Sequence, residues 1–258
     1  MRFLFIVGCP RSGTSALTYA LNAHPDVVLG LERFNSRIAR HVLQPQDFDR
    51  PRFFDVQPDD TWYRSLDQFK DYYENVAAKY DSGLYRGDKF PRGYEHYEYL
   101  SQTFADSYFI FILRNIFDVA ESFEARRVHG GNWPANGGPV AAVQRWNASI
   151  GYTLRWRERT RILIVAYEDL FIRDGSATPI AAFLGIDPNP LDAALARART
   201  ARPSRDGPRR PRLSPEHAEH ISRHANFIGF RQLLGVNPPQ RPAGQMADIR
   251  APASPLQG

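Results

Sequence analysis

Near its N-terminus the chain reads Arg2-Phe-Leu-Phe-Ile-Val-Gly8-Cys-Pro-Arg11-Ser12-Gly13-Thr14-Ser15-Ala-Leu-Thr-Tyr-Ala-Leu21, and this segment predicts much of the architecture. The apolar run 3–7 predicts a buried parallel strand, and Leu17 and Leu21, one turn apart, predict a helix. Between them lies a turn rich in glycine, proline and serine. A strand, such a turn and a helix form a phosphate-binding arrangement, because backbone N–H groups and the helix N-terminus face an anion there.

The spacing of the two glycines in this turn is that of a nucleotide-binding loop, with one difference. Gly8-x4-Gly13 matches the pattern G-x-x-x-x-G-K-[ST], but Thr14 occupies the lysine position and the nearby cation is Arg11. We therefore expect a phosphate-like ligand, bound without the lysine of ATP-cleaving loops. A tight turn without a ligand is the simpler alternative, but two glycines, three hydroxyls and an arginine exceed what a turn needs.

The segment Pro10-Arg11-Ser12-Gly13-Thr14-Ser15 resembles the 5′-phosphosulfate-binding loop of sulfotransferases that use 3′-phosphoadenosine-5′-phosphosulfate (PAPS). The similarity is greatest to the bacterial and carbohydrate-type members, which carry P-R-S-G-T. The resemblance implies that these residues bind the donor and that Arg11 holds its phosphosulfate during transfer. It also implies that the nucleotide product is adenosine 3′,5′-bisphosphate (PAP).

A second anion-binding segment follows the apolar run 108–113. Arg114 stands at the end of this predicted central strand, and Ser122 lies two turns into the next helix. An ATPase would place an aspartate near this strand end for magnesium, so the arginine favours an anion site without a metal. Arg114 and Ser122 match the family's R-x7-S motif, which grips the ribose 3′-phosphate. Asn115 replaces the more frequent aspartate, and we expect this replacement to weaken helix capping only.

Glu32 is the candidate general base. It follows a short predicted strand, 27–29, and a carboxylate there could take the proton that an attacking hydroxyl loses. A glutamate shortly after the second strand serves as base in some bacterial sulfotransferases, so the resemblance supports this assignment. The alternative is a salt bridge between Glu32 and Arg11, Arg33 or Arg37.

A further charged segment, Gly87-Asp88-Lys89-Phe90-Pro91, resembles the G-[DE]-K-x-P segment of bacterial sulfotransferases, whose lysine lies at the active-site rim. Lys89 could neutralise charge on the transferring sulfuryl group. Asp88 could orient Lys89 or act as base in place of Glu32, and an Asp–Lys pair that closes a strand is the structural alternative. His129, beside a glycine-rich loop, is a third candidate base.

The expected fold is α/β: a P-loop-like three-layer sandwich around a mostly parallel sheet of about five strands. We expect one sulfotransferase domain over 1–235, with an aromatic-rich insertion at 34–84 covering the acceptor side, and a disordered tail at 236–258. The segment 167–170, Y-E-D-L, is a family feature that we assign to support of the fold. Several arginines could reach the 3′-phosphate, although a solvated charge run is the simpler interpretation for most of them: Arg197, Arg199, Arg202, Arg205, Arg209, Arg210 and Arg212.

The composition limits the partners. The formal charge of +5 comes mainly from arginine, which suits bidentate binding of phosphate or sulfate, and no basic helix or RNA-binding motif indicates nucleic acid. Cys9 is the only cysteine, so an intrachain disulfide and a cysteine metal cage are excluded. No run is apolar enough to cross a bilayer, and we expect a cytoplasmic protein without integral membrane contact.

Together the motifs predict transfer of a sulfuryl group from PAPS to a hydroxyl or amine of a small metabolite, carbohydrate or lipid, without a metal. One alternative is an ATP-dependent small-molecule kinase, which would require magnesium and a lysine in the first loop. Another is a non-catalytic nucleotide-binding protein that retains the loop without its chemistry. Neither the acceptor nor the oligomeric state follows from the residues.

Overall fold

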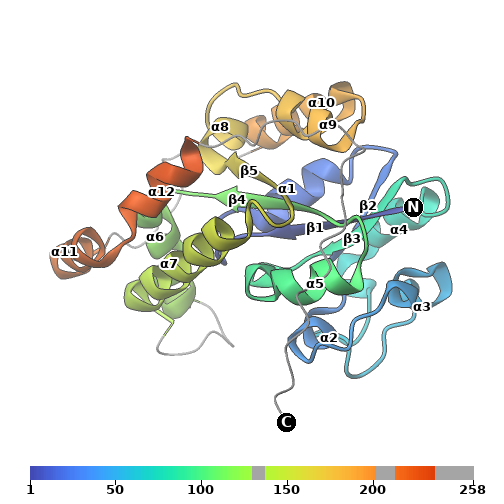
Figure 1. The fold of residues 1–258 in the computed structure, drawn as a ribbon, viewed down its shortest axis with the longest axis horizontal. Coiled ribbons are helices and arrows are strands. Elements are labelled where there is room, and N and C mark those ends of the chain that lie inside the picture. Colours follow the sequence, from blue (N-terminus) through green and yellow to red (C-terminus); the bar gives the residue numbers. More distant parts are fainter. Residues whose placement is uncertain (130–136, 202–212, 236–258) are drawn as a thin grey trace, which may run out of the picture.

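A computed structural model describes residues 1–129, 137–201 and 213–235. Within these residues a parallel sheet has the strand order β2-β3-β1-β4-β5 (Figure 1). The strands are β1 (Arg2–Val7), β2 (Val27–Leu31), β3 (Tyr85–Lys89), β4 (Tyr108–Leu113) and β5 (Arg161–Ala166). The predicted α/β class, with five strands in a central sheet, is confirmed. Every described strand pair is parallel.

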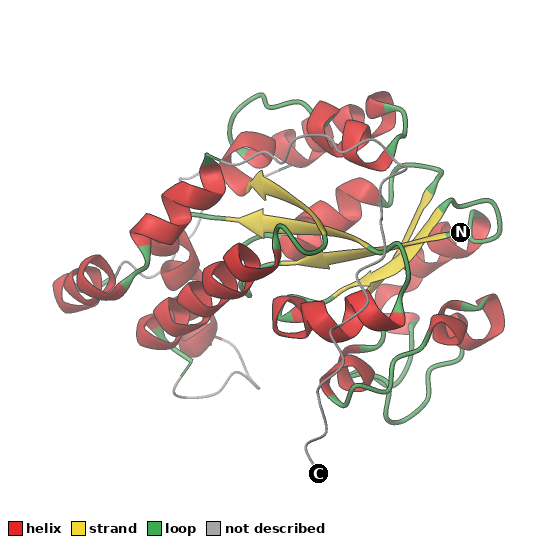
Figure 2. Cartoon of the chain, in the orientation of Figure 1, coloured by secondary structure: helices red, strands yellow, loops and turns green. Residues whose placement is uncertain are grey.

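Both faces of the sheet are covered by helices, as Figure 2 shows. In β1 the side chains of Phe3, Phe5 and Val7 belong to one buried cluster, whereas Leu4 and Ile6 belong to the other. Successive side chains of a strand point to opposite faces, so a strand buried on both faces must be apolar throughout. This explains why the run 3–7 shows no alternation of polar and apolar residues.

The two clusters divide the helices into two outer layers. One layer contains α1 (Thr14–Leu21), α8 (Tyr167–Phe171), α9 (Thr178–Leu184) and α10 (Pro188–Thr200). The other contains α5 (Tyr97–Thr103), α6 (Ile116–His129), α7 (Pro139–Trp156), α11 (Pro215–His224) and α12 (Phe227–Leu234), with η3 (Gly93–His96) before α5. The result is the three-layer sandwich expected from the sequence.

The insertion between β2 and β3, residues 34–84, packs against the second layer through buried aromatic rings such as Phe34, Phe48 and Phe53. Its elements are α2 (Asn35–Ala39), η1 (Pro45–Phe48), α3 (Arg50–Phe54), η2 (Asp67–Phe69) and α4 (Lys70–Ala78). Pro45 and Pro51 lie in the first turns of η1 and α3, where proline fits because those N–H groups have no partner within the helix.

The described C-terminal part consists of two helices rather than one: α11 ends at His224 and α12 begins at Phe227. Asn226 separates them, because its side chain accepts a hydrogen bond from Gly229 N at 2.9 Å and caps α12. Its own N–H donates to Asn147 Oδ1 at 2.8 Å, which fixes the break against α7.

Across residues 1–129, 137–201 and 213–235, no helix combines the length and the apolar character that a membrane-spanning helix requires.

Candidate active site

The candidate residues lie along the edge formed by the carboxyl ends of the parallel strands. Leu31 and Ile6 both align with Lys89, so Glu32, Lys89 and the loop after β1 follow one another along this edge. Arg114 follows β4 and Tyr167 follows β5. These two residues are neighbours at the edge because Leu113 aligns with Ala166. Parallel sheets bind ligands at such an edge.

The loop after β1 has little room for side chains at its two glycines. A Cβ on Gly8 would lie 2.6 Å from the carbonyl oxygen of Ile112, and a Cβ on Gly13 would collide with the ring of Tyr167. Gly13 also has φ +98°, which favours glycine, and it forms the N-terminal boundary of α1. The two glycines therefore let the loop and the start of α1 pack closely against β4 and the ring of Tyr167.

The polar side chains of the loop divide into buried and exposed ones. Ser12 and Thr14 are buried, whereas Arg11 and Ser15 are exposed. Within the described part of the chain the hydroxyl of Ser12 has no hydrogen-bond partner. A buried hydroxyl without a partner is costly, so its position suits a ligand oxygen. This orphan hydroxyl and the glycine-lined loop fit an anionic group such as a phosphosulfate.

Cys9 is also part of this loop but is buried, with 1% of its surface exposed. Burial raises the pKa of its thiol, so Cys9 stays protonated at neutral pH. It packs as a small apolar side chain.

The first loop and the R-x7-S segment are in contact. Nε of Arg11 donates a hydrogen bond to Oγ of Ser122 at 3.0 Å, and a guanidinium nitrogen of Arg114 donates to the carbonyl of Arg11 at 3.2 Å. Arg11 has φ +72°, and this left-handed backbone helps to place its carbonyl beside Arg114. Two arginines and a serine from three chain segments thus meet at one place, on the side of the edge formed by β1 and β4.

Arg114 is held in place by residues that the sequence had not assigned to the site. Its guanidinium lies over the ring of Tyr167, 4.1 Å from the ring centre, and Nε1 of Trp146 donates to its carbonyl at 2.9 Å. Asp118 approaches Arg114 Nε at 3.9 Å. Tyr167 thus supports both Gly13 and Arg114, and the Y-E-D-L segment was the signal that could have indicated this.

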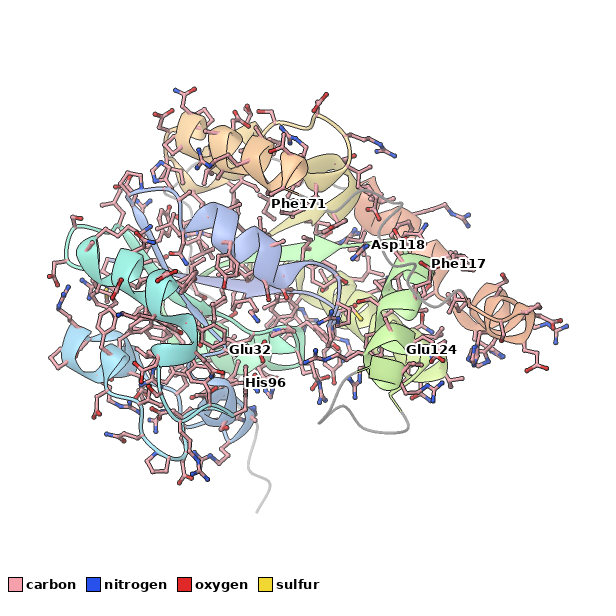
Figure 3. The ribbon with its side chains drawn as sticks, turned by 180° about the vertical axis from the view of Figure 1, so that it is seen from behind. Glu32, His96, Phe117, Asp118, Glu124 and Phe171 are labelled. Carbon is pink, nitrogen blue, oxygen red and sulfur yellow. The ribbon has the colours of Figure 1, made fainter. Side chains whose placement is uncertain are left out.

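Asn115 caps α6 despite the replacement of the more frequent aspartate. Its Oδ1 accepts a hydrogen bond from Phe117 N at 2.8 Å, and Oε1 of Glu168 accepts one from Asn115 N at 3.0 Å. Asn115 therefore caps α6, and a carboxylate from the Y-E-D-L segment holds its backbone N–H. Figure 3 labels Phe117 and Asp118 in this first turn of α6.

A second group of candidates lies where β2 and β3 end. The ammonium of Lys89 is ion-paired with the carboxylate of Glu32. The Lys89 side chain is 5% exposed and that of Glu32 is 25% exposed, so solvent reaches the carboxylate and hardly reaches the ammonium. The partner of Glu32 is therefore Lys89 and not Arg11, Arg33 or Arg37, the alternatives considered from the sequence. Figure 3 labels Glu32 on this side of the molecule.

Asp88 is fully buried beneath Glu32. Its Oδ2 accepts a hydrogen bond from Phe34 N at 2.9 Å, and its Oδ1 accepts one from Lys89 N at 2.8 Å. Burial raises the pKa of Asp88 to about 7, although the hydrogen bonds from these N–H groups act to lower it. With both oxygens used by the backbone and without access to solvent, Asp88 suits a positioning role, and Glu32 is the better placed of the two candidate bases.

Most of the remaining candidates fall outside the part of the chain that the structure describes. The side chain of His129 and most of the C-terminal arginines are outside the described residues: Arg202, Arg205, Arg209, Arg210 and Arg212. Arg199 donates to the carbonyls of Leu170 and Gly175, at 3.0 and 3.2 Å, and so holds the α8–α9 connection. Among the residues that the structure describes, no group of three or more histidine, cysteine, aspartate or glutamate side chains is arranged to hold a metal ion.

Comparison with known proteins identifies the class. A family model described as the sulfotransferase family matches residues 4–190, and the chain therefore belongs to the sulfotransferase family. The matched region contains both groups of candidate residues. A comparison with curated protein sequences gave no match.

Solved structures share this fold. One is the sulfotransferase domain of the Synechococcus PCC 7002 olefin synthase, with 21% identity, a TM-score of 0.52 and coverage of 93% of this chain and 96% of that one. A sulfotransferase from Alicyclobacillus acidocaldarius has 17% identity and a TM-score of 0.54, covering 92% and 97%. Mouse sulfotransferase SULT7A1, in complex with PAP, has 17% identity and a TM-score of 0.53, covering 91% and 87%.

Proposed function

We propose that this transferase moves a sulfuryl group from PAPS to a hydroxyl or amine of a small metabolite, carbohydrate or lipid. The observation that carries the proposal is the contact of Arg11 with both Ser122 and Arg114. These residues belong to two motifs that lie far apart in the sequence, and each motif suits an anion. Their meeting at the sheet edge supports a single bisphosphorylated nucleotide that uses both motifs.

The donor would be held by residues of β1, β4 and the turns that follow them. The N–H groups of residues 13–15, at the start of α1, and the hydroxyl of Ser12 suit the phosphosulfate, and Arg114 and Ser122 suit the 3′-phosphate. When bound, PAPS supplies the sulfuryl group and leaves as PAP. The structural similarity to a mouse sulfotransferase that is complexed with PAP agrees with this choice of nucleotide.

Glu32 and Lys89 would act on the acceptor side. Glu32 takes the proton that the acceptor hydroxyl loses as its oxygen bonds to sulfur, because solvent reaches its carboxylate and does not reach that of Asp88. Lys89, which lies beside Glu32, offsets the negative charge of the transferring sulfuryl group. Arg11 and the loop N–H groups stabilise the charge that develops on the departing phosphate oxygen.

The domain organisation remains part of the proposal. We assign residues 1–235 to the sulfotransferase domain and the insertion 34–84 to the acceptor side. The insertion is suited to this role because it follows Glu32 directly in the chain. The acceptor's identity would have to come from its contacts with this segment.

Calorimetry tests the nucleotide. PAP is titrated into the protein, and ATP is titrated separately, each with and without magnesium. We expect PAP to bind without magnesium and more tightly than ATP. Magnesium-dependent ATP binding that exceeds PAP binding would favour the kinase alternative and overturn the proposal.

A transfer assay tests the chemistry. Donor carrying a radioactive sulfuryl group is incubated with pools of hydroxyl and amine compounds, and labelled products are separated. We expect label in at least one acceptor pool and the release of PAP in equal amount. PAP binding without transfer to any pool would instead support the non-catalytic alternative.

A further inference from the structure

Two adjacent residues of the insertion bind two adjacent residues at the end of β2. Oγ1 of Thr61 donates a hydrogen bond to the carbonyl of Glu32 at 2.5 Å, and Oδ2 of Asp60 pairs with the guanidinium of Arg33 at 2.7 Å. A backbone hydrogen bond joins the same segments, since Ser36 N donates to the carbonyl of Asp60 at 2.9 Å. Hydrogen bonds from side chains and backbone therefore hold the segment 60–61 against the segment 32–36.

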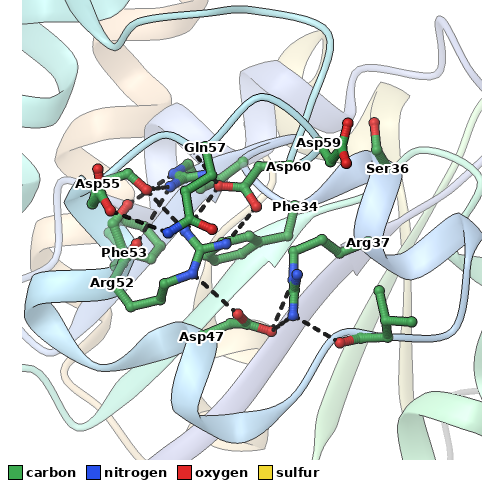
Figure 4. Close-up of polar contacts among 12 residues, drawn as sticks. Phe34, Ser36, Arg37, Asp47, Arg52, Phe53, Asp55, Gln57, Asp59 and Asp60 are labelled. Carbon is green, nitrogen blue, oxygen red and sulfur yellow. Dashed lines mark hydrogen bonds and ion pairs between the residues drawn. The ribbon is translucent and has the colours of Figure 1, made fainter.

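Asp60 is the centre of a buried charged network, which Figure 4 shows in close-up. Its carboxylate also pairs with Arg52, and it accepts a hydrogen bond from Gln57 N at 2.9 Å. Burial acts to raise the pKa of Asp60, but hydrogen bonds from Arg52 and Arg33 outweigh it and lower the pKa to about 2. Asp60 is therefore ionised at neutral pH.

Arg33 is fully buried, and its guanidinium nitrogens donate hydrogen bonds to several partners. Besides Asp60 it donates to the carbonyls of Phe53 at 2.8 Å and Asp55 at 2.6 Å. A buried arginine with this many partners cannot move without breaking several charge-assisted hydrogen bonds. Arg33 thus fixes the position of Asp60, and Thr61 follows it in the chain.

The residue that Thr61 binds has an unfavourable backbone conformation. Glu32 has φ +58°, which is uncommon for a residue other than glycine, asparagine or aspartate. Such a conformation persists only when its surroundings impose it, and it is found preferentially at functional sites. Here Thr61 binds the carbonyl of Glu32, Glu32 N donates to the carbonyl of Lys89 at 3.2 Å, and Asp88 accepts from Phe34 N.

We propose that Thr61 is a positioning residue for the base: its hydrogen bond, kept in place by Asp60, holds Glu32 in the left-handed conformation that directs the carboxylate toward Lys89. This inference rests on the proposed role of Glu32. Without the hydroxyl of Thr61 the backbone at Glu32 can relax toward a commoner conformation, and the carboxylate loses its alignment. The donor site is on β1 and β4, so donor binding is unaffected.

Thr61→Val is the test, because valine keeps the shape of threonine and removes the hydrogen bond. We expect kcat to fall about 10- to 100-fold, as misplacement of a catalytic group does, with an unchanged KM for PAPS. Thr61→Ser keeps the hydroxyl and should restore most of kcat. Thr153→Val is the matched control, since Thr153 is buried in α7 and its hydroxyl bonds to Tyr97 at 3.2 Å, away from the edge.

A double-mutant cycle separates positioning from folding. In the Glu32→Gln background, Thr61→Val should have no further effect on kcat, because the group that it positions is already lost. PAP binding by calorimetry reports that each variant is folded. Additive losses in the cycle, or a kcat of Thr61→Val equal to that of Thr153→Val, would overturn the positioning role.

The same set of variants separates this inference from the proposed function. If Glu32→Gln retains the wild-type kcat, Glu32 is not the base, and both the mechanism and the role of Thr61 are wrong. If Glu32→Gln loses activity while Thr61→Val keeps it, the mechanism stands and the role of Thr61 alone is wrong.

Discussion

The ammonium of Lys89 is paired with the carboxylate of Glu32 across the ends of two neighbouring strands, and the side chain of Lys89 is almost completely buried. A buried charge depends on its partner, so loss of either residue leaves the other uncompensated. The pair therefore links the stability of this edge to the chemistry that we propose for it.

Replacement of Lys89 by methionine tests the contribution of its charge. Methionine keeps most of the apolar stem, and we expect kcat to fall about 10²- to 10³-fold, the usual effect of removing one electrostatic stabiliser. The KM for PAPS should change much less, because the donor residues lie on β1 and β4. Steady-state kinetics with donor and acceptor varied separately give both values.

Lys79→Met is the control for the Lys89 variant. Lys79 is also partly buried and donates to the carbonyls of Asn22, His24 and Val27, at 2.5 to 2.6 Å, far from the candidate site. Its loss should lower the melting temperature with little effect on kcat. Equal effects of the two replacements on kcat would mean that Lys89 acts only through stability.

Replacement of Arg114 by alanine tests the donor site. Loss of a hydrogen bond to a charged group costs about 1.5–3 kcal/mol, so the KM for PAPS should rise roughly 10- to 150-fold. The KM for the acceptor should change far less. Arg199→Ala, which removes an arginine that holds the α8–α9 connection, should leave the KM for PAPS unchanged. A similar rise in KM for donor and acceptor would contradict the assignment of Arg114.

The parts of the fold that follow from local sequence were predictable. The runs 3–7 and 108–113 predict central strands because strands buried on both faces are apolar throughout, and both strands are present. Arg11, Arg114 and Ser122 were singled out because their residue types suit anions. Their direct contact was not predictable, since it depends on β4 lying beside β1.

Other features depend on partners that are distant in sequence. The pair formed by Glu32 and Lys89 requires β2 beside β3, and the support from Tyr167 requires β5 beside β4. Arg33 was considered from the sequence as a salt-bridge partner of Glu32, yet it is fully buried, with Asp60 and three backbone carbonyls around it. Neither periodicity nor motif spacing carries this information.

The stability should depend on His96 at acid pH. Its pKa is lowered, chiefly by burial and then by His41, whose Nε2 lies 2.9 Å from His96 Nδ1. A histidine with a lowered pKa in the folded state binds a proton more readily when unfolded, so its contribution to stability is lost as the pH falls below about 6.5. We expect the difference in free energy of unfolding between wild type and His96→Gln to shrink between pH 8 and pH 5.

Urea unfolding at several pH values measures this difference. The comparison with the variant is needed because other groups titrate over the same range and cancel in the difference. A difference that stays constant, or grows as the pH falls, would show that His96 is not held in its neutral form.

Replacement of Asp88 by asparagine tests the buried carboxyl beneath the base. Asparagine has a single acceptor oxygen, so one of the N–H groups of Phe34 and Lys89 loses its partner, at a cost of about 1–3 kcal/mol in the free energy of unfolding. The pKa of Asp88 is raised to about 7 in the folded protein. The carboxyl group therefore contributes its full stabilisation below its pKa in the unfolded chain, and this stabilisation is lost as the pH rises through 7. Asp88→Asn should therefore be more destabilising at pH 6 than at pH 8, as measured by urea unfolding. A larger cost at pH 8 would mean that the folded state prefers the ionised carboxylate, held by the N–H groups of the backbone.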